Sequence, residues 1–129
     1  MKTTLMVSFS IPGLKLESES NTRDGWRAKA YRTKVARHAA EMHTRAALGG
    51  RNLSAPIAIT LCRIGPRRLD PGNCEASFKG VQDGVADALG IDDGDPRLTW
   101  RYEQASPGPL RPGERKYRVE VVIQGSERP

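Results

Sequence analysis

Residues 56–89 read PIAITLCRIGPRRLDPGNCEASFKGVQDGVADAL and combine a strand pattern with a helix pattern. The first part, from Pro56 to Ile64, is rich in Ile, Thr and Leu and is closed by Gly65-Pro66, which predicts a strand. Residues 67–72 form a predicted loop. From about Asn73 to Leu89, apolar residues recur at helical spacing, which predicts a helix with Asn73 as its N-cap. The expected apolar face of that helix comprises Cys74, Phe78, Val81, Val85, Ala88 and Leu89.

The flanking segments add three strands and one helix. Residues 5–10, 97–104 and 116–123 predict strands, and residues 26–48 predict a helix ended by Gly49-Gly50. The expected apolar stripe of this helix is Tyr31, Val35, Ala39, Met42 and Ala46. The order is therefore β-α-β-α-β-β, which predicts one α+β domain over residues 1–125, with a mixed sheet and two helices packed on it. Residues 126–129 are expected to be a frayed tail.

The charge distribution indicates a polyanionic partner and a divalent cation. The chain carries a net charge of +6, but residues 70–95 hold seven of the fifteen acids and one base, Lys79, so this segment carries −6 and the remainder +12. A basic body suits nucleic acid, because phosphate contacts release condensed counterions. An acidic segment within it would repel phosphate unless a metal ion neutralised the carboxylates and bound the phosphate oxygen.

Other classes of protein fit the sequence poorly. Cys62 and Cys74 form neither a disulfide framework nor, with the distant histidines, a zinc site, so we expect two reduced thiols. No apolar run approaches the roughly 20 residues of a membrane span, and the first apolar stretch is too short for a signal peptide. We therefore expect a cytoplasmic protein with no membrane partner.

The acidic segment also has a motif-like order. It reads Arg-Arg-Leu-Asp-x-x-Asn, then Lys79 and Asp83, then Ile-Asp-Asp-Gly-Asp over residues 91–95. On spacing alone, Glu75, Lys79, Asp83 and Asp87 would suit a solvated helix face with an ordinary ion pair, and Asp92-Asp93-Gly94-Asp95 is a common turn composition. Taken together and in order, residues 67–104 resemble the RusA-like Holliday-junction endonucleases, particularly their phage-encoded branch.

That resemblance implies a homodimeric, magnesium-dependent endodeoxyribonuclease that resolves four-way DNA junctions in recombination and repair. Mn²⁺ is expected to substitute for Mg²⁺. By position, Asp70, Lys79 and Asp93 match the catalytic set, and Asp70, Asp92 and Asp93 are the expected metal ligands. Asn73, Glu75 and Asp83 are possible additional site residues. Arg27, Lys34, Arg37, Arg67 and Arg68 are the expected nucleic-acid contacts.

One departure from the family pattern leaves two alternatives open. The family usually has a second Asp where this chain has Gly72, and Gly72 cannot ligate a metal. A DNA-junction-binding protein of the same fold with impaired chemistry would account for that change, whereas the retained Asp70, Lys79, Asp92 and Asp93 favour an enzyme. A basic RNA-binding or ribosome-associated protein would fit the charge but would leave the acidic segment unexplained, and no RNP-type aromatic signature is present.

Overall fold

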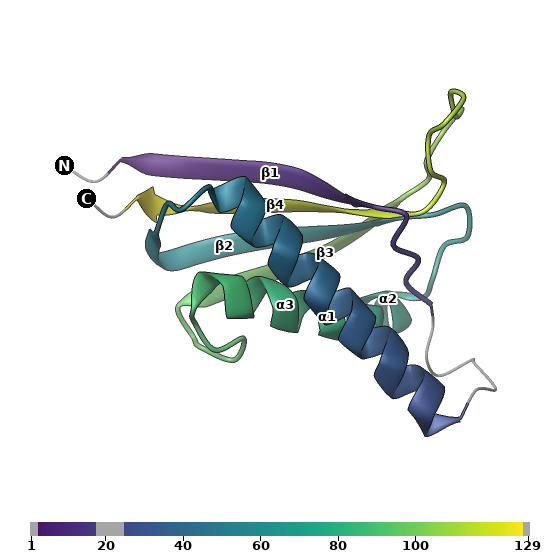
Figure 1. Cartoon of the computed structure of the whole chain (residues 1–129), viewed down its shortest axis with the longest axis horizontal. Coiled ribbons are helices and arrows are strands. Elements are labelled where there is room, and N and C mark those ends of the chain that lie inside the picture. The colour runs from purple at the N-terminus through teal and green to yellow at the C-terminus, as the bar shows by residue number, and fades with distance from the viewer. Residues whose placement is uncertain (1–2, 18–24, 128–129) are drawn as a thin grey trace.

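Four strands form one mixed sheet in the computed structural model, which describes residues 3–17 and 25–127. They are β1 (Thr4–Pro12), β2 (Leu53–Ile64), β3 (Leu98–Ala105) and β4 (Arg118–Glu127), in the spatial order β1-β4-β2-β3. Strands β2 and β3 are parallel, while β4 is antiparallel to both β1 and β2. The helices α1 (Trp26–Leu48), α2 (Pro71–Ser77) and α3 (Lys79–Leu89) pack on one face of this sheet (Figure 1). The predicted α+β class with a mixed sheet is confirmed.

The second predicted helix is in fact two helices. Helix α2 begins one residue after Asp70 rather than at Asn73, because Pro71 suits the first helical turn, where its missing N–H group costs nothing. Phe78 separates the two helices, and its fully buried ring stacks on Tyr102 at a centroid distance of 5.8 Å. The core therefore anchors the junction between α2 and α3 at this ring.

The buried face of α1 differs from the predicted stripe. Its buried residues are Ala36, Ala40, Thr44 and Leu48. By contrast, Tyr31, Val35 and Met42 of the expected stripe are 70%, 43% and 55% exposed. The hydroxyl of Thr44 is satisfied inside the helix, where it donates to the Ala40 carbonyl oxygen at 2.6 Å. Small side chains occupy the buried face because α1 and α3 approach too closely for larger ones.

Two glycines of α3 make that close approach possible. A Cβ atom at Gly80 would lie 2.6 Å from the Thr33 carbonyl oxygen, and one at Gly84 would overlap the Arg37 carbonyl oxygen. Real Cβ atoms do not tolerate such contacts, so any side chain at either position would force the helices apart. The glycines thus bring Arg37 of α1 beside the polar stripe of α3.

The strand directions determine at which end of the sheet each connecting segment lies. Strands β1, β2 and β3 all run toward the same end, because β1 and β2 are each antiparallel to β4 and β3 is parallel to β2. Residues 13–17, 65–70 and 106–117 therefore lie at one end, and residues 90–97 at the other. Figure 1 shows that the connection between β3 and β4 projects well beyond the sheet.

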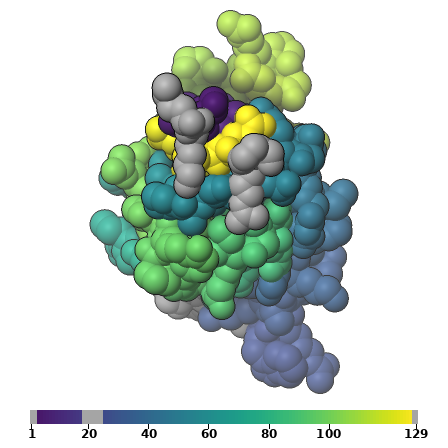
Figure 2. All heavy atoms as spheres, turned by 90° about the vertical axis from the view of Figure 1, so that its left-hand side faces the viewer, coloured from purple at the N-terminus to yellow at the C-terminus, as the bar shows by residue number. Residues whose placement is uncertain are grey.

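The last strand, β4, extends closer to the C-terminus than the sequence predicted. Strand β4 continues to Glu127, whose N–H group donates to the Thr3 carbonyl oxygen at 2.9 Å. Residues 126 and 127 are therefore not a frayed tail, and residues 128 and 129 lie outside the described part of the chain. Figure 2 shows the molecule from the side of the sheet where β1 begins and β4 ends.

Candidate functional site

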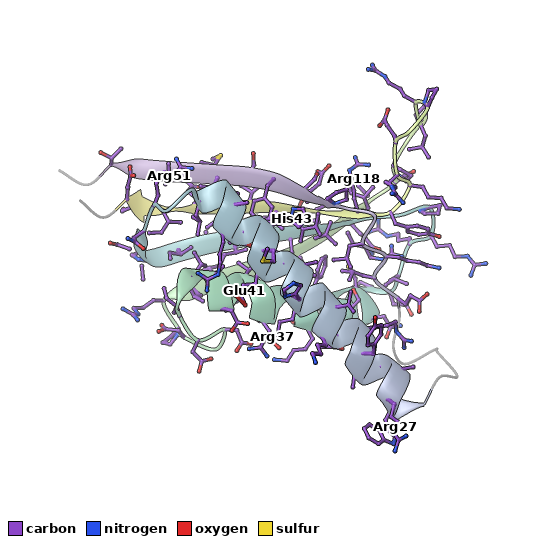
Figure 3. All side chains as sticks on the ribbon, in the orientation of Figure 1. Arg27, Arg37, Glu41, His43, Arg51 and Arg118 are labelled. Carbon is purple, nitrogen blue, oxygen red and sulfur yellow. The ribbon has the colours of Figure 1, made fainter. Side chains whose placement is uncertain are left out.

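The close packing of α1 on α3 produces the first ion pair of the candidate site. Arg37 donates from Nε and Nη2 to the two carboxylate oxygens of Asp87, at 2.6 and 2.9 Å. Its Nη1 atom also lies 3.9 Å from Oδ2 of Asp83. This bidentate arrangement is the strongest geometry that arginine offers a carboxylate. Arg37, labelled in Figure 3, therefore links α1 to α3 through Asp87.

Lys79 connects two carboxylates of the same region. Its ammonium group donates to Oδ1 of Asp83 at 3.1 Å and to Oδ2 of Asp93 at 3.4 Å. Asp83 lies one turn further along α3, whereas Asp93 comes from the connection between α3 and β3. The Lys79 side chain is 65% exposed, so its ammonium group remains accessible to an incoming anion.

A tryptophan holds the segment that carries Asp93. The indole Nε1 of Trp100, on β3, donates to the backbone carbonyl oxygen of Asp93 at 3.0 Å. Within the same turn, the Asp92 carboxylate accepts a hydrogen bond from the Gly94 N–H group at 2.9 Å. These contacts fold the connection back along α3 and bring Asp93 to Lys79.

The resulting site is an open polar cavity of about 520 Å³. Its charged lining residues are Arg37, Lys79, Asp83, Asp87, Asp92 and Asp93. Four carboxylates and two cations give this lining a net charge of −2, in a chain that is otherwise basic.

The ion pairs shift the pKa values of Lys79, Asp87 and Asp93 in the cavity. The hydrogen bond to Asp83 raises the pKa of Lys79, so the side chain stays an ammonium and cannot act as a base. Burial alone would raise the pKa of Asp93, but the charge of Lys79 and its hydrogen bond outweigh burial, and the pKa is lowered. The hydrogen bond from Arg37 likewise lowers the pKa of Asp87.

Asp70 is placed apart from the other predicted ligands. It is exposed at the start of α2 and does not line the cavity that contains Asp92 and Asp93. Within residues 3–17 and 25–127, no three Asp, Glu, His or Cys side chains are grouped as metal ligands. The predicted trio of carboxylates is thus not assembled within one chain. Asn73 is half-buried in α2, and Glu75 lines a different cavity, beside Arg68 and Tyr102.

The predicted nucleic-acid contacts fall into two groups. Arg37 forms one group by itself, because its guanidinium is paired with Asp87 in the absence of any partner, and its contact with nucleic acid stays a prediction. Arg27, whose guanidinium lies 5.3 Å from the Trp26 ring centroid, is exposed, as are Lys34, Arg67 and Arg68. None of these four forms an ion pair with a residue that the structure describes.

Sequence reasoning missed two residues that shape the site. Exposed and less exposed side chains alternate along β3, and Trp100 lies on the less exposed face. Nothing in the sequence indicates its hydrogen bond to the Asp93 backbone. The sequence pattern predicts Asp87 only as part of a solvated helix face with Glu75, Lys79 and Asp83. Its partner lies fifty residues away in the chain, so local spacing gives no sign of the pair.

Both cysteines are free thiols, as expected, with Cys74 buried and Cys62 partly exposed. Burial raises the pKa of each thiol. In the described part of the chain, none of the helices has the length and apolar character of a bilayer-crossing segment.

Comparison with known proteins gives a relative but no family. No family model matches the chain. An uncharacterized protein of Xylella fastidiosa (strain Temecula1) is 36% identical over 94 residues, which cover 68% of this chain and 61% of that protein. The match therefore spans about six tenths of the relative's length. Among solved structures, 2C-methyl-D-erythritol 2,4-cyclodiphosphate synthase from Plasmodium vivax covers 75% of this chain and 55% of its own, at 16% identity and a TM-score of 0.29. A likeness of that size carries no argument about fold or function.

Proposed function

We propose that this protein is a metal-dependent endodeoxyribonuclease that cleaves branched DNA, with four-way junctions as its substrate and the cytoplasm as its place of action. The observation that carries the proposal is the position of Lys79. Its accessible ammonium group lies between Asp83 and Asp93 in an acidic cavity of a basic protein. The RusA-like order of residues 67–104 supports the same reaction class.

The donor set of the cavity suits a magnesium ion that also binds substrate. Mg²⁺ is usually held through one or two carboxylates and completed by water and substrate phosphate, and Asp92 and Asp93 line the same cavity. Asp92 and Asp93 would hold the ion, which when bound activates water and neutralises phosphate charge. Asp70 remains a proposed third ligand that would have to approach from outside this cavity.

Lys79 would act on the phosphate rather than on the water. Because it stays protonated, it stabilises the negative charge that develops on the phosphoryl oxygens or on the leaving oxygen. Asp83 would hold the ammonium in place, and Arg37 would hold α1 against α3 through Asp87. Arg37 is therefore a positioning residue in this proposal.

Symmetric cleavage of a junction also requires two such sites related by a two-fold axis. We therefore propose a homodimer as the active form. Sedimentation at micromolar concentration should give roughly twice the chain mass, and a monomer both free and on DNA would contradict junction resolution.

A labelled four-way junction tests the proposal directly. Wild-type protein should cleave the junction in Mg²⁺ or Mn²⁺, and Asp93→Asn should abolish cleavage while leaving junction binding intact. Asp95→Asn is a matched control, because Asp95 is a nearby carboxylate that pairs with Arg97 and does not line the cavity. Equal cleavage by wild type and Asp93→Asn under saturating Mn²⁺ would remove this cavity as the catalytic centre.

A junction-binding protein without cleavage is the second candidate. The observation that favours it is the pairing of Asp83, Asp87 and Asp93 with cations of the chain itself. A cluster balanced in this way is also what a purely structural network would show. Binding that is equal with and without divalent metal, together with intact junctions after long incubation, would select this candidate.

A further inference from the structure

A buried arginine, Arg63, lies near the end of β2, at the end of the sheet that carries residues 13–17, 65–70 and 106–117. Arg63 is 5% exposed and donates to the carbonyl oxygens of Leu16, at 3.0 Å, and Arg67, at 2.6 Å. These carbonyl groups accept hydrogen bonds from Nε and Nη1 but do not neutralise the charge of the guanidinium. No carboxylate in the described part of the chain lies within ion-pair distance of it. A buried charge without a counter-charge attracts an anion to its vicinity.

A cavity of about 190 Å³ opens beside this arginine. Arg63, Arg67, Arg68 and Ser106 contribute to its lining, and none of the acidic residues that the structure describes does. Three guanidinium groups and a hydroxyl are the donors that bind a phosphate group, and arginine matches phosphate geometry through two N–H groups at once. The chemistry of this cavity is therefore that of a phosphate site.

The projecting connection between β3 and β4 extends the positive surface away from the cavity. Residues 106–118 carry four bases and one acid. Arg111, Arg115 and Lys116 are exposed, and Glu114 lies only 4.0 Å from Nε of Arg111, so it neutralises one of them in part. Three prolines restrict the backbone of this connection. Figure 3 places Arg118 at its base, toward the end of the sheet opposite Arg51.

Hydrogen bonds join the three connections into one surface. The Gly13 N–H group donates to the Tyr117 carbonyl oxygen at 2.9 Å, and that of Gly65 to the Ala105 carbonyl oxygen at 3.1 Å. The Leu69 N–H group donates to Oε1 of Gln104 at 2.9 Å, and Nε2 of Gln104 donates to the Leu69 carbonyl oxygen at 2.7 Å. The backbones of the three connections are thus tied to one another and to β3 at this end of the sheet.

The aromatic content of this surface favours duplex over single-stranded nucleic acid. Tyr117 is the one aromatic residue in residues 13–17, 65–70 and 106–117. Its ring lies 5.0 Å from the Lys15 ammonium and 5.4 Å from that of Lys116, so both cations occupy the ring. Single-strand binders stack bases on free aromatic side chains, which this surface does not offer. A phosphate backbone is the partner that its donors fit.

From these observations we propose that the three connections form a backbone-binding surface for double-stranded DNA. One phosphate would occupy the cavity of Arg63, Arg67 and Arg68, and Arg111 and Arg115 would contact the backbone further along. The inference rests on the proposed function, because it names the surface by which the arm of a branched substrate is held. It extends the predicted contacts Arg67 and Arg68 to Arg63 and to the connection between β3 and β4.

The test is DNA binding without divalent metal, which separates binding from cleavage. Fluorescence anisotropy would follow a labelled duplex of about 20 base pairs as salt is raised from roughly 50 to 200 mM. The double variant Arg111→Gln/Arg115→Gln should bind at least about tenfold more weakly, and the salt slope should shrink by about 2, since each phosphate contact contributes about 0.9. The matched control is Arg51→Gln/Arg97→Gln, which loses the same charge at the opposite end of the sheet and should keep its affinity within about twofold. Thermal unfolding of both variants would verify that they fold.

A second variant tests the cavity without removing the buried arginine. Ser106→Glu places a carboxylate at the cavity lining and should weaken duplex binding about tenfold, because a phosphate would be repelled there. Ser8→Glu, at an exposed position of β1, adds the same charge elsewhere and should change little. Equal losses in the test and control variants would overturn the proposal, as would tighter binding to duplex RNA of the same sequence.

The outcomes distinguish this surface from the proposed reaction. If Arg111→Gln/Arg115→Gln and Ser106→Glu bind DNA like wild type while Asp93→Asn abolishes cleavage, the proposed DNA-binding surface is wrong and the proposed endonuclease activity stands. If the variants lose DNA affinity but wild-type protein never cleaves in Mg²⁺ or Mn²⁺, the endonuclease is wrong and the surface stands.

Discussion

Lys79 and Asp93 are fourteen residues apart in the chain, yet Nζ of Lys79 lies 3.4 Å from Oδ2 of Asp93. Helix α3 leads away from Lys79, and the connection after it returns because Trp100 binds the Asp93 carbonyl oxygen. An ammonium group and a candidate metal ligand thus meet in one cavity, and Lys79 can be tested separately from the carboxylates.

Replacement of Lys79 should affect cleavage much more than binding. Lys79→Ala is expected to slow single-turnover cleavage of a four-way junction by about 100-fold or more, the size typical of one lost charge-stabilising donor. Junction affinity should change only a few-fold, because one phosphate contact is a small part of a basic surface. Lys79→Arg retains the charge and should recover part of the rate. A parallel loss of affinity and rate would assign Lys79 to binding alone.

Gly72→Asp should restore a carboxylate at the position where the resemblance expects one. Nothing lies within 4 Å of a Cβ atom built at Gly72, so α2 has room for the side chain. If Asp70 and residue 72 reach the metal, cleavage in Mg²⁺ should rise and the Mg²⁺ concentration for half-maximal activity should fall. Gly72→Asn is the control, since it has the same shape without the charge. Identical kinetics of the Asp and Asn variants would place position 72 outside the metal site.

Local sequence pattern predicted much of this fold. Residues 26–48 form α1 to the residue, because Gly49 ends it in the left-handed conformation at φ +58°. The four strands and their order along the chain follow from apolar stretches between turn residues, whereas the spatial order β1-β4-β2-β3 was not predicted. The predicted buried stripe of Tyr31, Val35 and Met42 is wrong, because large apolar residues at helical spacing do not by themselves mark the face that packs. The real face needed small residues opposite Gly80 and Gly84, which only the packing of two helices reveals.

The candidate site was predictable in composition but not in assembly. The sequence order identified Lys79, Asp83, Asp92 and Asp93, and the structure brings these four to one cavity. The pairing of Arg37 with Asp87 depends on how α1 crosses α3, so the sequence alone gives no sign of it, and a nucleic-acid contact by Arg37 stays a prediction. Asp70 precedes α2 whereas Asp92 and Asp93 follow α3, so two helices separate these carboxylates in the chain, and Asp70 does not line the cavity.

The Arg37–Asp87 pair should make stability depend on pH in the acid range. The hydrogen bond from Arg37 lowers the folded-state pKa of Asp87 below its ordinary value of 3.8. A depressed carboxyl pKa stabilises the folded state fully above about pH 5, and that contribution is lost as pH falls through the folded-state pKa. Asp87→Asn should therefore be less stable than wild type at pH 6, with the difference shrinking toward pH 3. Urea unfolding at the two pH values measures this, and a constant difference would show that the pair does not contribute through charge.

The contact of α1 with α3 can be tested with two glycine-to-alanine substitutions in helices. Gly84→Ala places a methyl group against the Arg37 carbonyl oxygen and within 2.8 Å of the Ala40 Cβ, so the helices must separate. Overpacking of this kind costs about 1–3 kcal/mol in the free energy of unfolding. Gly72→Ala meets no atom within 4 Å and should stabilise α2 by up to about 0.5 kcal/mol, because alanine loses less backbone entropy than glycine on folding. The free energy of unfolding from urea denaturation should therefore fall in Gly84→Ala and rise in Gly72→Ala.

The same contact between α1 and α3 brings Arg37 to Asp87. Gly84→Ala should therefore also reduce the stability cost of Asp87→Asn in a double-mutant cycle. Unchanged stability in Gly84→Ala would mean that α1 and α3 do not approach as closely as the glycines allow.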